Sequence, residues 1–69
     1  PIHFYIIENN INWDNNQLIE DFLIFSIDGK LVFENKNLKS SIKINQLKKG
    51  IYYIDYKFQG KNFFQKIVI

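Results

Sequence analysis

The stretch IYYIDYKF, residues 51–58, decides the fold class of this chain. Every second position carries a large aromatic or branched side chain, and charged residues fall only in the other set. Because successive side chains of a strand point to opposite faces, this two-residue period is typical of a β-strand with one buried face. The residues that we expect to face the core are Tyr52, Ile54, Tyr56 and Phe58.

Similar runs occur throughout the rest of the chain. They are rich in Ile, Phe, Tyr and Val, and short clusters of Asn, Asp, Gly and Lys separate them. Strand-like runs interrupted by turns at such spacing favour a sandwich or a barrel. The expected strands are residues 2–7, 11–13, 22–27, 30–34, 38–44, 51–58 and 63–69. We therefore expect an all-β fold of six to seven antiparallel strands.

One range allows a second interpretation. The apolar residues of 18–23 also fit the stripe of a short helix, with Asn15 or Asn16 as its N-cap. We prefer the strand there, and the helix stays open as an alternative.

Glycine-containing turns are expected to join neighbouring strands. Asp28 and Gly29 are a residue pair typical of a two-residue type I′ hairpin, because both of its central positions need a positive φ. Gly60 lies within residues 59–62, which we expect to form a four-residue loop between the last two strands. Asp28, Gly29 and Gly60 are therefore interpreted as structural turn residues.

Composition excludes several kinds of chemistry. The 69 residues make one small domain, residues 1–69, without Cys for a disulfide or a thiolate. His3 is the only His, which excludes a His-pair zinc site and leaves a catalytic triad implausible. The segment at Asp14 lacks the Gly and Glu that an EF-hand calcium loop requires. We expect no enzyme activity, no cofactor and no metal.

Other partners are also disfavoured. Lys57, Lys61 and Lys66 beside Tyr53 and Phe63 have the residue types of a single-stranded nucleic-acid site, but the net charge is only +2 and Arg is absent. No apolar run approaches the roughly 20 residues that cross a bilayer. We expect no nucleic acid, no small-molecule substrate and no membrane embedding. The absence of Met suggests that Pro1 is not a translation start, so we expect a piece of a longer protein.

Three segments resemble successive motifs of one family. LIFSIDGKLV (23–32) resembles a hairpin of the form hydrophobic-x-aromatic-x-x-x-Gly-Lys/Arg-x-Val, and IKINQLKKGIYYI (42–54) resembles Ile-x-Leu-x-x-Gly-Ile/Val-Tyr. Residues 59–61 followed by 64–69 resemble its Asn-Gly-Lys turn and terminal strand. The family is the type A C-terminal sorting domain of the Bacteroidetes type IX secretion system. The chain departs from it in keeping only Pro1 of a Pro-x-Pro start and in ending at Ile69 without Lys or Arg.

The resemblance implies a fold and a function. Its members are small immunoglobulin-like (Ig-like) β-sandwiches at the end of secreted cargo proteins, and they act as folded, non-catalytic signals. The implied partners are the type IX translocon, an outer-membrane shuttle protein and a sortase. The implied route crosses the periplasm and the outer membrane and ends at the cell surface or in the medium.

Partner recognition is expected on surface features and on the last strand. Lys30, Gly50, Tyr52 and Lys66 are the candidate surface features, although Gly50 also suits a turn and Tyr52 also suits the core. If residues 63–69 lie at a sheet edge, their free backbone groups can pair with a receptor strand. The candidate contacts there are Ile67, Val68 and Ile69.

An alternative function is a carbohydrate-binding or spacer module of a surface adhesin or enzyme. Trp13, Tyr5 and Tyr53 would then form a platform on which sugar rings stack. Such a platform requires these three aromatic rings to be exposed on one face, whereas a sorting domain requires an exposed last strand.

Overall fold

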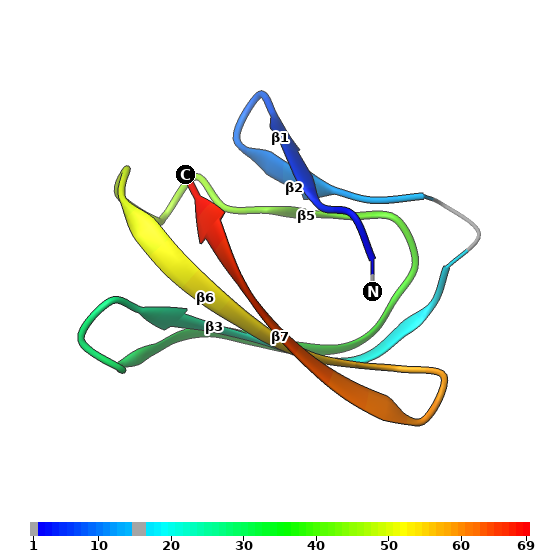
Figure 1. The fold of residues 1–69 in the computed structure, drawn as a ribbon. Coiled ribbons are helices and arrows are strands. Elements are labelled where there is room, and N and C mark those ends of the chain that lie inside the picture. The colour runs from blue at the N-terminus through cyan, green and yellow to red at the C-terminus, as the bar shows by residue number, and fades with distance from the viewer. Residues whose placement is uncertain (1, 15–16) are drawn as a thin grey trace.

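The computed structural model describes residues 2–14 and 17–69, which fold into two antiparallel sheets without a helix (Figure 1). The described strands are β1 (Tyr5–Ile7), β2 (Asn10–Asn12), β3 (Ile19–Ser26), β4 (Leu31–Leu38), β5 (Ser41–Lys43), β6 (Ile51–Phe58) and β7 (Lys61–Val68). The predicted all-β fold, a small Ig-like sandwich with seven antiparallel strands in the described residues, is confirmed.

The two sheets differ in size and enclose the core between them. The larger sheet has the strand order β4-β3-β6-β7, and the smaller sheet has the order β1-β2-β5 (Figure 1). Both central strands of the larger sheet, β3 and β6, are long and pair with each other from Asp21↔Lys57 to Ser26↔Tyr52. This pairing places the inward faces of two aromatic-rich strands side by side.

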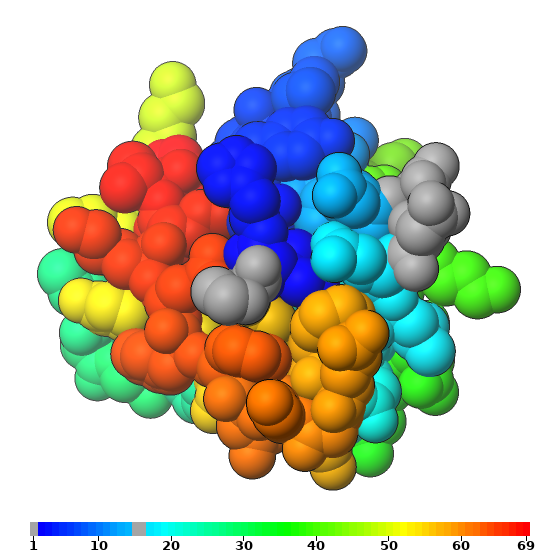
Figure 2. Space-filling view, turned by 45° about the vertical axis from the view of Figure 1, so that its right-hand side comes forward, coloured from blue at the N-terminus to red at the C-terminus, as the bar shows by residue number. Residues whose placement is uncertain are grey.

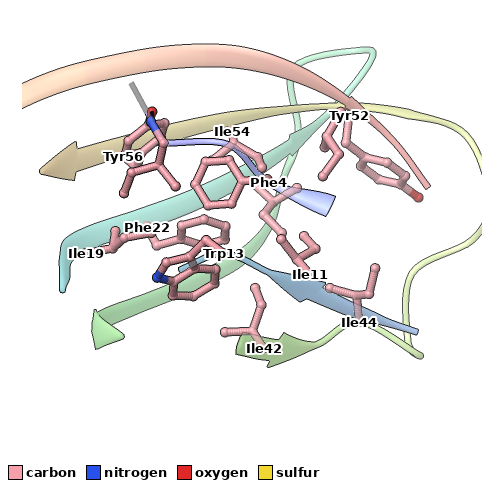
Figure 3. Packing of buried hydrophobic residues seen from close by; sticks show 13 residues of the cluster. Phe4, Ile11, Trp13, Ile19, Phe22, Ile42, Ile44, Tyr52, Ile54 and Tyr56 are labelled. Atoms are coloured by element: carbon pink, nitrogen blue, oxygen red, sulfur yellow. Dashed lines mark hydrogen bonds between the residues drawn. The ribbon is translucent and has the colours of Figure 1, made fainter. Parts of the chain in front are cut away.

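The core is built mainly from aromatic rings and Ile side chains (Figure 3). Phe4 meets Tyr56 edge to face, with ring centroids 5.1 Å apart, and Trp13 stacks on Phe22 at 6.1 Å. Such arrangements add to the stabilisation that burial of the rings already provides. The alternation predicted for β6 is confirmed, since Tyr52, Ile54 and Tyr56 are buried and Phe58 packs partly buried against the core.

Most predicted strand boundaries were shifted, since β3 begins at Ile19 rather than residue 22, β4 runs to Leu38 rather than residue 34 and β7 begins at Lys61 rather than residue 63. Two predicted strands were also wrong in their extent. Residues 2–7 were expected as one strand, but only Tyr5–Ile7 pair in a sheet, although Ile2 and Phe4 are buried in the core. Residues 38–44 were also expected as one strand, whereas β4 extends to Leu38 and β5 begins at Ser41. Asn37 adopts a φ of +55° within β4, next to the Ile19↔Leu38 pair that ends the ladder with β3.

The helical alternative for residues 18–23 is also wrong. Ile19 begins β3, which has partners on both sides, β4 and β6. A central strand forms two ladders of hydrogen bonds and buries Phe22 and Ile24 completely, so tertiary pairing overrides the local helical pattern. The proposed N-cap residues Asn15 and Asn16 lie outside the described residues, as does Pro1.

The β3–β4 turn differs from the predicted type I′ hairpin. Gly29 has a φ of +87°, but Asp28 is not among the residues with positive φ. The Gly29 N–H donates to the Ser26 carbonyl at 2.9 Å and the Ser26 N–H donates to the Lys30 carbonyl at 2.8 Å. The loop therefore has three residues between Ser26 and Lys30, a common arrangement in which the glycine adopts the left-handed conformation.

The β6–β7 turn is shorter than predicted. β6 ends at Phe58 and β7 begins at Lys61, so two residues form the loop rather than four. Gln59 and Gly60 have φ values of +52° and +76°, as the primed two-residue turns require. The Gly60 N–H also donates to the Glu20 carboxylate at 2.9 Å, which ties this turn to β3.

Candidate functional site

The last strand lies at an edge of the larger sheet, which is the condition set above for recognition through its backbone groups. In the described part of the chain, β7 pairs with β6 alone, and its other side has no strand partner (Figure 1). An edge strand presents unpaired backbone N–H and C=O groups, and these groups can bind an added strand. We call β7 and its unpaired side the open edge.

The register shows which backbone groups face the open edge. The N–H groups of Gly50 and Ile69 each donate to the carbonyl of the other residue, at 2.9 Å and 2.8 Å, so these two form a hydrogen-bonded pair. In an antiparallel ladder such pairs alternate with pairs that make no mutual hydrogen bond. The β7 residues that bond to β6 are thus Lys61, Phe63, Gln65 and Ile67, and Ile69 just after β7 bonds to Gly50. Those whose backbone groups point to the open edge are Asn62, Phe64, Lys66 and Val68.

The side chains of β7 follow the same alternation. Phe64 and Val68 are exposed, at 66% and 62% of their surface, and Lys66 between them is also exposed. Ile67 is 8% exposed in the core, and Ile69 is partly buried against it. In Figure 2 part of β7, coloured orange to red, lies at the surface on this face of the molecule. Of the three candidate contacts at the end of the chain, only Val68 is well exposed.

An apolar region adjoins the open edge on the outer face of the larger sheet. Ile51 lies directly opposite Val68, and Tyr53 stacks on Phe64 with ring centroids 5.5 Å apart and an interplanar angle of 8°. Phe25 is the β3 partner of Tyr53 and Leu31 is the β4 partner of Phe25. Sequence reasoning missed this region, although the alternation of residues 64, 66 and 68 could have indicated it.

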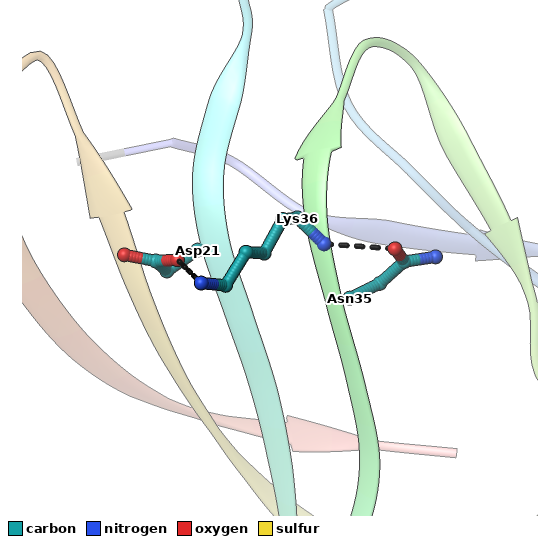
Figure 4. Close-up of polar contacts among 3 residues, drawn as sticks. All are labelled: Asp21, Asn35 and Lys36. Carbon is teal, nitrogen blue, oxygen red and sulfur yellow. Dashed lines mark hydrogen bonds and ion pairs between the residues drawn. The ribbon is translucent and has the colours of Figure 1, made fainter.

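The other end of this face is charged. An open cavity of about 380 Å³ lies there, and its polar lining includes Asp21, Glu34, Lys36, Asp55, Lys57 and Asn62. Lys36 Nζ lies 3.9 Å from the Asp21 carboxylate, and the Lys36 backbone N–H donates to Asn35 Oδ1 (Figure 4). Both charged groups are largely exposed, so the pair contributes at most about 1 kcal/mol of stability. The lining mixes both signs of charge and favours no one class of ligand.

The predicted surface features are unequally accessible. Lys30 and Lys66 are exposed, whereas Gly50 is partly buried and bonded to Ile69. Tyr52 is 8% exposed and its hydroxyl donates to the Lys48 carbonyl at 2.6 Å. The structure therefore brings Gly50 and Tyr52 together beneath the end of β7, where they position that strand.

The Lys30 side of the domain contains the titratable group with a shifted pKa. The Ser26 hydroxyl donates to the Asp28 carboxylate and lowers the pKa of that carboxyl below its ordinary value. Backbone N–H groups of the turn act in the same direction, since each stabilises the ionised form. Asp28 is fully exposed, and these bonds hold the conformation of the β3–β4 turn.

The aromatic residues proposed for sugar stacking do not form a platform. Trp13 is 2% exposed, and its indole N–H donates to the Gln17 carbonyl inside the fold. Tyr5 lies on β1 of the smaller sheet, while Tyr53 lies on β6 of the larger sheet. The three rings share no exposed face, so this prediction was wrong.

The described residues contain no assembled metal site or membrane span. Across 2–14 and 17–69, no three His, Cys, Asp or Glu side chains are grouped so that they could hold a metal ion. The calcium question raised at Asp14 involves Asn15 and Asn16, which lie outside these ranges. In the same part of the chain, no helix has the length and apolarity needed to cross a membrane.

These features define a small two-sheet β-sandwich in which the edge strand β7 is flanked by exposed apolar side chains. Residues 6–69 match the family described as the secretion system C-terminal sorting domain, so the chain belongs to that family. This is the type IX family that the three sequence motifs indicated. No curated protein and no solved structure matches the chain.

Proposed function

We propose that this domain is the non-catalytic address of an exported protein and that the type IX machinery recognises it in its folded state. Family membership establishes the coarser role, a secretion sorting signal. The proposed partners are the translocon, an outer-membrane shuttle protein and a sortase, and the proposed destination is the cell surface or the medium. The cargo passes through the periplasm on this route.

The open edge is the observation that supports recognition of a folded domain. It combines unpaired backbone groups with the exposed side chains of Phe64, Lys66 and Val68. Beneath it, Tyr52 and the Gly50–Ile69 pair hold the strand in place. The contacts that position β7 exist only in the folded domain. A partner therefore binds the open edge only when the domain is folded.

A fusion experiment tests this function. The domain is attached to the C-terminus of a reporter that carries a signal for export to the periplasm, in a bacterium with a type IX system. We expect the reporter at the cell surface or in the medium, and in the periplasm when a translocon gene is deleted. Retention of the fusion in the periplasm of the intact strain contradicts the proposal.

A control separates folding from recognition. Removing Ile67, Val68 and Ile69 together cannot do so, because Ile67 lies in the core and Ile69 bonds to Gly50. Ile54→Asp instead places a charge where the side chain is fully buried, which unfolds the domain without altering β7. We expect this fusion to remain in the periplasm, and efficient secretion of it would show that an unfolded sequence is read.

A further inference from the structure

We propose that the open edge binds an extended strand of a partner protein, with apolar side chains beside Phe64 and Val68 and a carboxylate beside Lys66. This inference rests on the proposed function and deepens it, because it states the chemistry of the partner. Every second residue of β7 has free backbone groups at the open edge and an exposed side chain on the outer face.

The backbone provides the first part of this site. Asn62, Phe64, Lys66 and Val68 direct their N–H and C=O groups away from β6. An added strand forms hydrogen bonds with these groups, in a second ladder like the one that already joins β6 to β7. Main-chain hydrogen bonds then provide affinity, and the flanking side chains provide selectivity.

The side chains provide the second part. Phe64, Lys66 and Val68 project from the outer face in the order apolar, cationic, apolar, and all three are exposed. Directly opposite residues of neighbouring strands lie about 4.5–5.5 Å apart at Cβ, close enough for side chains to interact. A partner strand therefore covers Phe64 and Val68 and pairs with Lys66 when every second residue of it is in turn apolar, acidic and apolar.

The neighbouring strand prepares this surface. Tyr53 holds the Phe64 ring by stacking, and Ile51 lies opposite Val68. An apolar side chain from the partner extends these contacts by one strand and continues the apolar region across the new sheet. Little side-chain freedom of Phe64 is then lost on binding, which favours affinity.

Charge identifies the occupant. The sequence of β7, KNFFQKIV, contains two Lys and no acidic residue, and Lys66 forms no ion pair with the described residues. An antiparallel second copy of β7 would place Lys66 opposite another Lys66, an apolar side chain or an amide. Like charges directly opposite are destabilising, whereas an opposite charge stabilises the pair. The favoured occupant is therefore an acidic strand of a different protein.

Amide hydrogen exchange of the 69-residue chain tests the backbone part. The probe is a ten-residue peptide in which Ser alternates with the series Val, Glu, Val, Glu, Val, added in excess. One face of its strand then carries Val, Glu and Val opposite Phe64, Lys66 and Val68. The control is the same peptide with Lys in place of Glu. We expect the amides of Phe64, Lys66 and Val68 to exchange fast in the free domain and to become protected only by the acidic peptide. Equal protection by both peptides, or none by the acidic one, overturns the proposal.

Matched charge reversals test the side-chain part. Lys66→Glu is expected to weaken binding of the acidic peptide at least about tenfold, because it places like charges opposite each other. The same variant should bind the control peptide with Lys instead. Lys43→Glu makes the same change at an exposed position of β5 in the smaller sheet, away from the open edge, and should leave binding unchanged. Equal effects of the two reversals overturn the proposal.

The reporter fusion separates this inference from the proposed function. If the wild-type fusion is not secreted, the sorting function itself fails. If the wild type and Lys66→Glu are secreted equally well, the sorting function stands and the edge inference fails. Protection of the same amides at high protein concentration without peptide would identify a second copy as the occupant, which also overturns it.

Discussion

The hydroxyl of Tyr56 provides the sharpest test of how the beginning of the chain is held. Tyr56 is 1% exposed, and its hydroxyl accepts a hydrogen bond of 2.8 Å from the Ile2 N–H. The same hydroxyl donates to Gln65 Oε1 at 3.2 Å. One oxygen therefore connects three segments of the chain, namely the residues before β1, strand β6 and strand β7.

Tyr56→Phe removes this oxygen and keeps the ring that packs against Phe4. The Ile2 N–H then loses its partner while Ile2 remains 3% exposed. A buried donor left without a partner costs about 1–3 kcal/mol. In a domain of this size, about 2 kcal/mol lowers the melting temperature by about 8–16 °C.

Chemical denaturation followed by Trp13 fluorescence measures the free energy of unfolding, and amide exchange at Ile2 reports the local effect. Tyr53→Phe is the control, because no hydrogen bond of its hydroxyl with the described residues is present. Its loss should change stability by less than about 0.5 kcal/mol. Equal stability of the two variants would refute the assignment of the Ile2 anchor to Tyr56.

Three further perturbations test the turns and the two sides of β7. Gly60→Ala places an L side chain at a φ of +76° with no neighbouring atom to clash, so backbone strain alone should lower the free energy of unfolding by about 1–2 kcal/mol. Gly60→Asn, measured by the same chemical denaturation, should lower it less, because Asn tolerates a positive φ better. Because the pKa of Asp28 is lowered in the folded domain, its ionised carboxylate stabilises the fold above the ordinary carboxyl pKa, and this stabilisation disappears as the pH falls through the lowered value. Asp28→Ala should therefore make the free energy of unfolding fall less steeply at acidic pH, and an unchanged slope would contradict this. Ile67→Ala should lower the free energy of unfolding by about 2–4 kcal/mol because Ile67 lies in the core. Val68→Ala, at the next and exposed position, should lower it by less than about 0.5 kcal/mol. Similar losses for both variants in urea denaturation would show that the assigned faces are wrong.

Much of the fold was predictable because the decisive signals are local. The alternation along residues 51–58 predicted both the strand and its buried face, since the period of two is a property of the extended backbone itself. The three motifs predicted the family for the same reason, as they are read directly from neighbouring residues.

Turn geometry was predicted less well. Asp28 and Gly29 were expected in a two-residue turn, but Ser26 bonds to both Asp28 and Lys30 and stabilises a longer loop. The two-residue turns lie instead at Glu8–Asn9 and Gln59–Gly60, where both residues have positive φ. A side chain outside the turn therefore decided its type, which a dipeptide preference cannot describe.

The sequence predicted the candidate site only in part. The sequence indicated that the last strand carries recognition, but it grouped Ile67, Val68 and Ile69 as equivalent contacts. The register places Ile67 in the core and Val68 outside, and it assembles Phe64, Tyr53 and Ile51 beside Val68. These neighbours come from different strands, so their proximity depends on pairing rather than on spacing in the sequence.

By itself, the sequence determined that this chain forms β-strands with an aromatic core and that it carries the motifs of a secretion sorting domain. Only the tertiary structure decided the strand order, the open edge at β7 and the link between Ile2 and Tyr56, residues 54 positions apart. Side-chain alternation and turn preference act between near neighbours. Strand order depends on which faces two sheets can bury together, and that is a property of the whole chain.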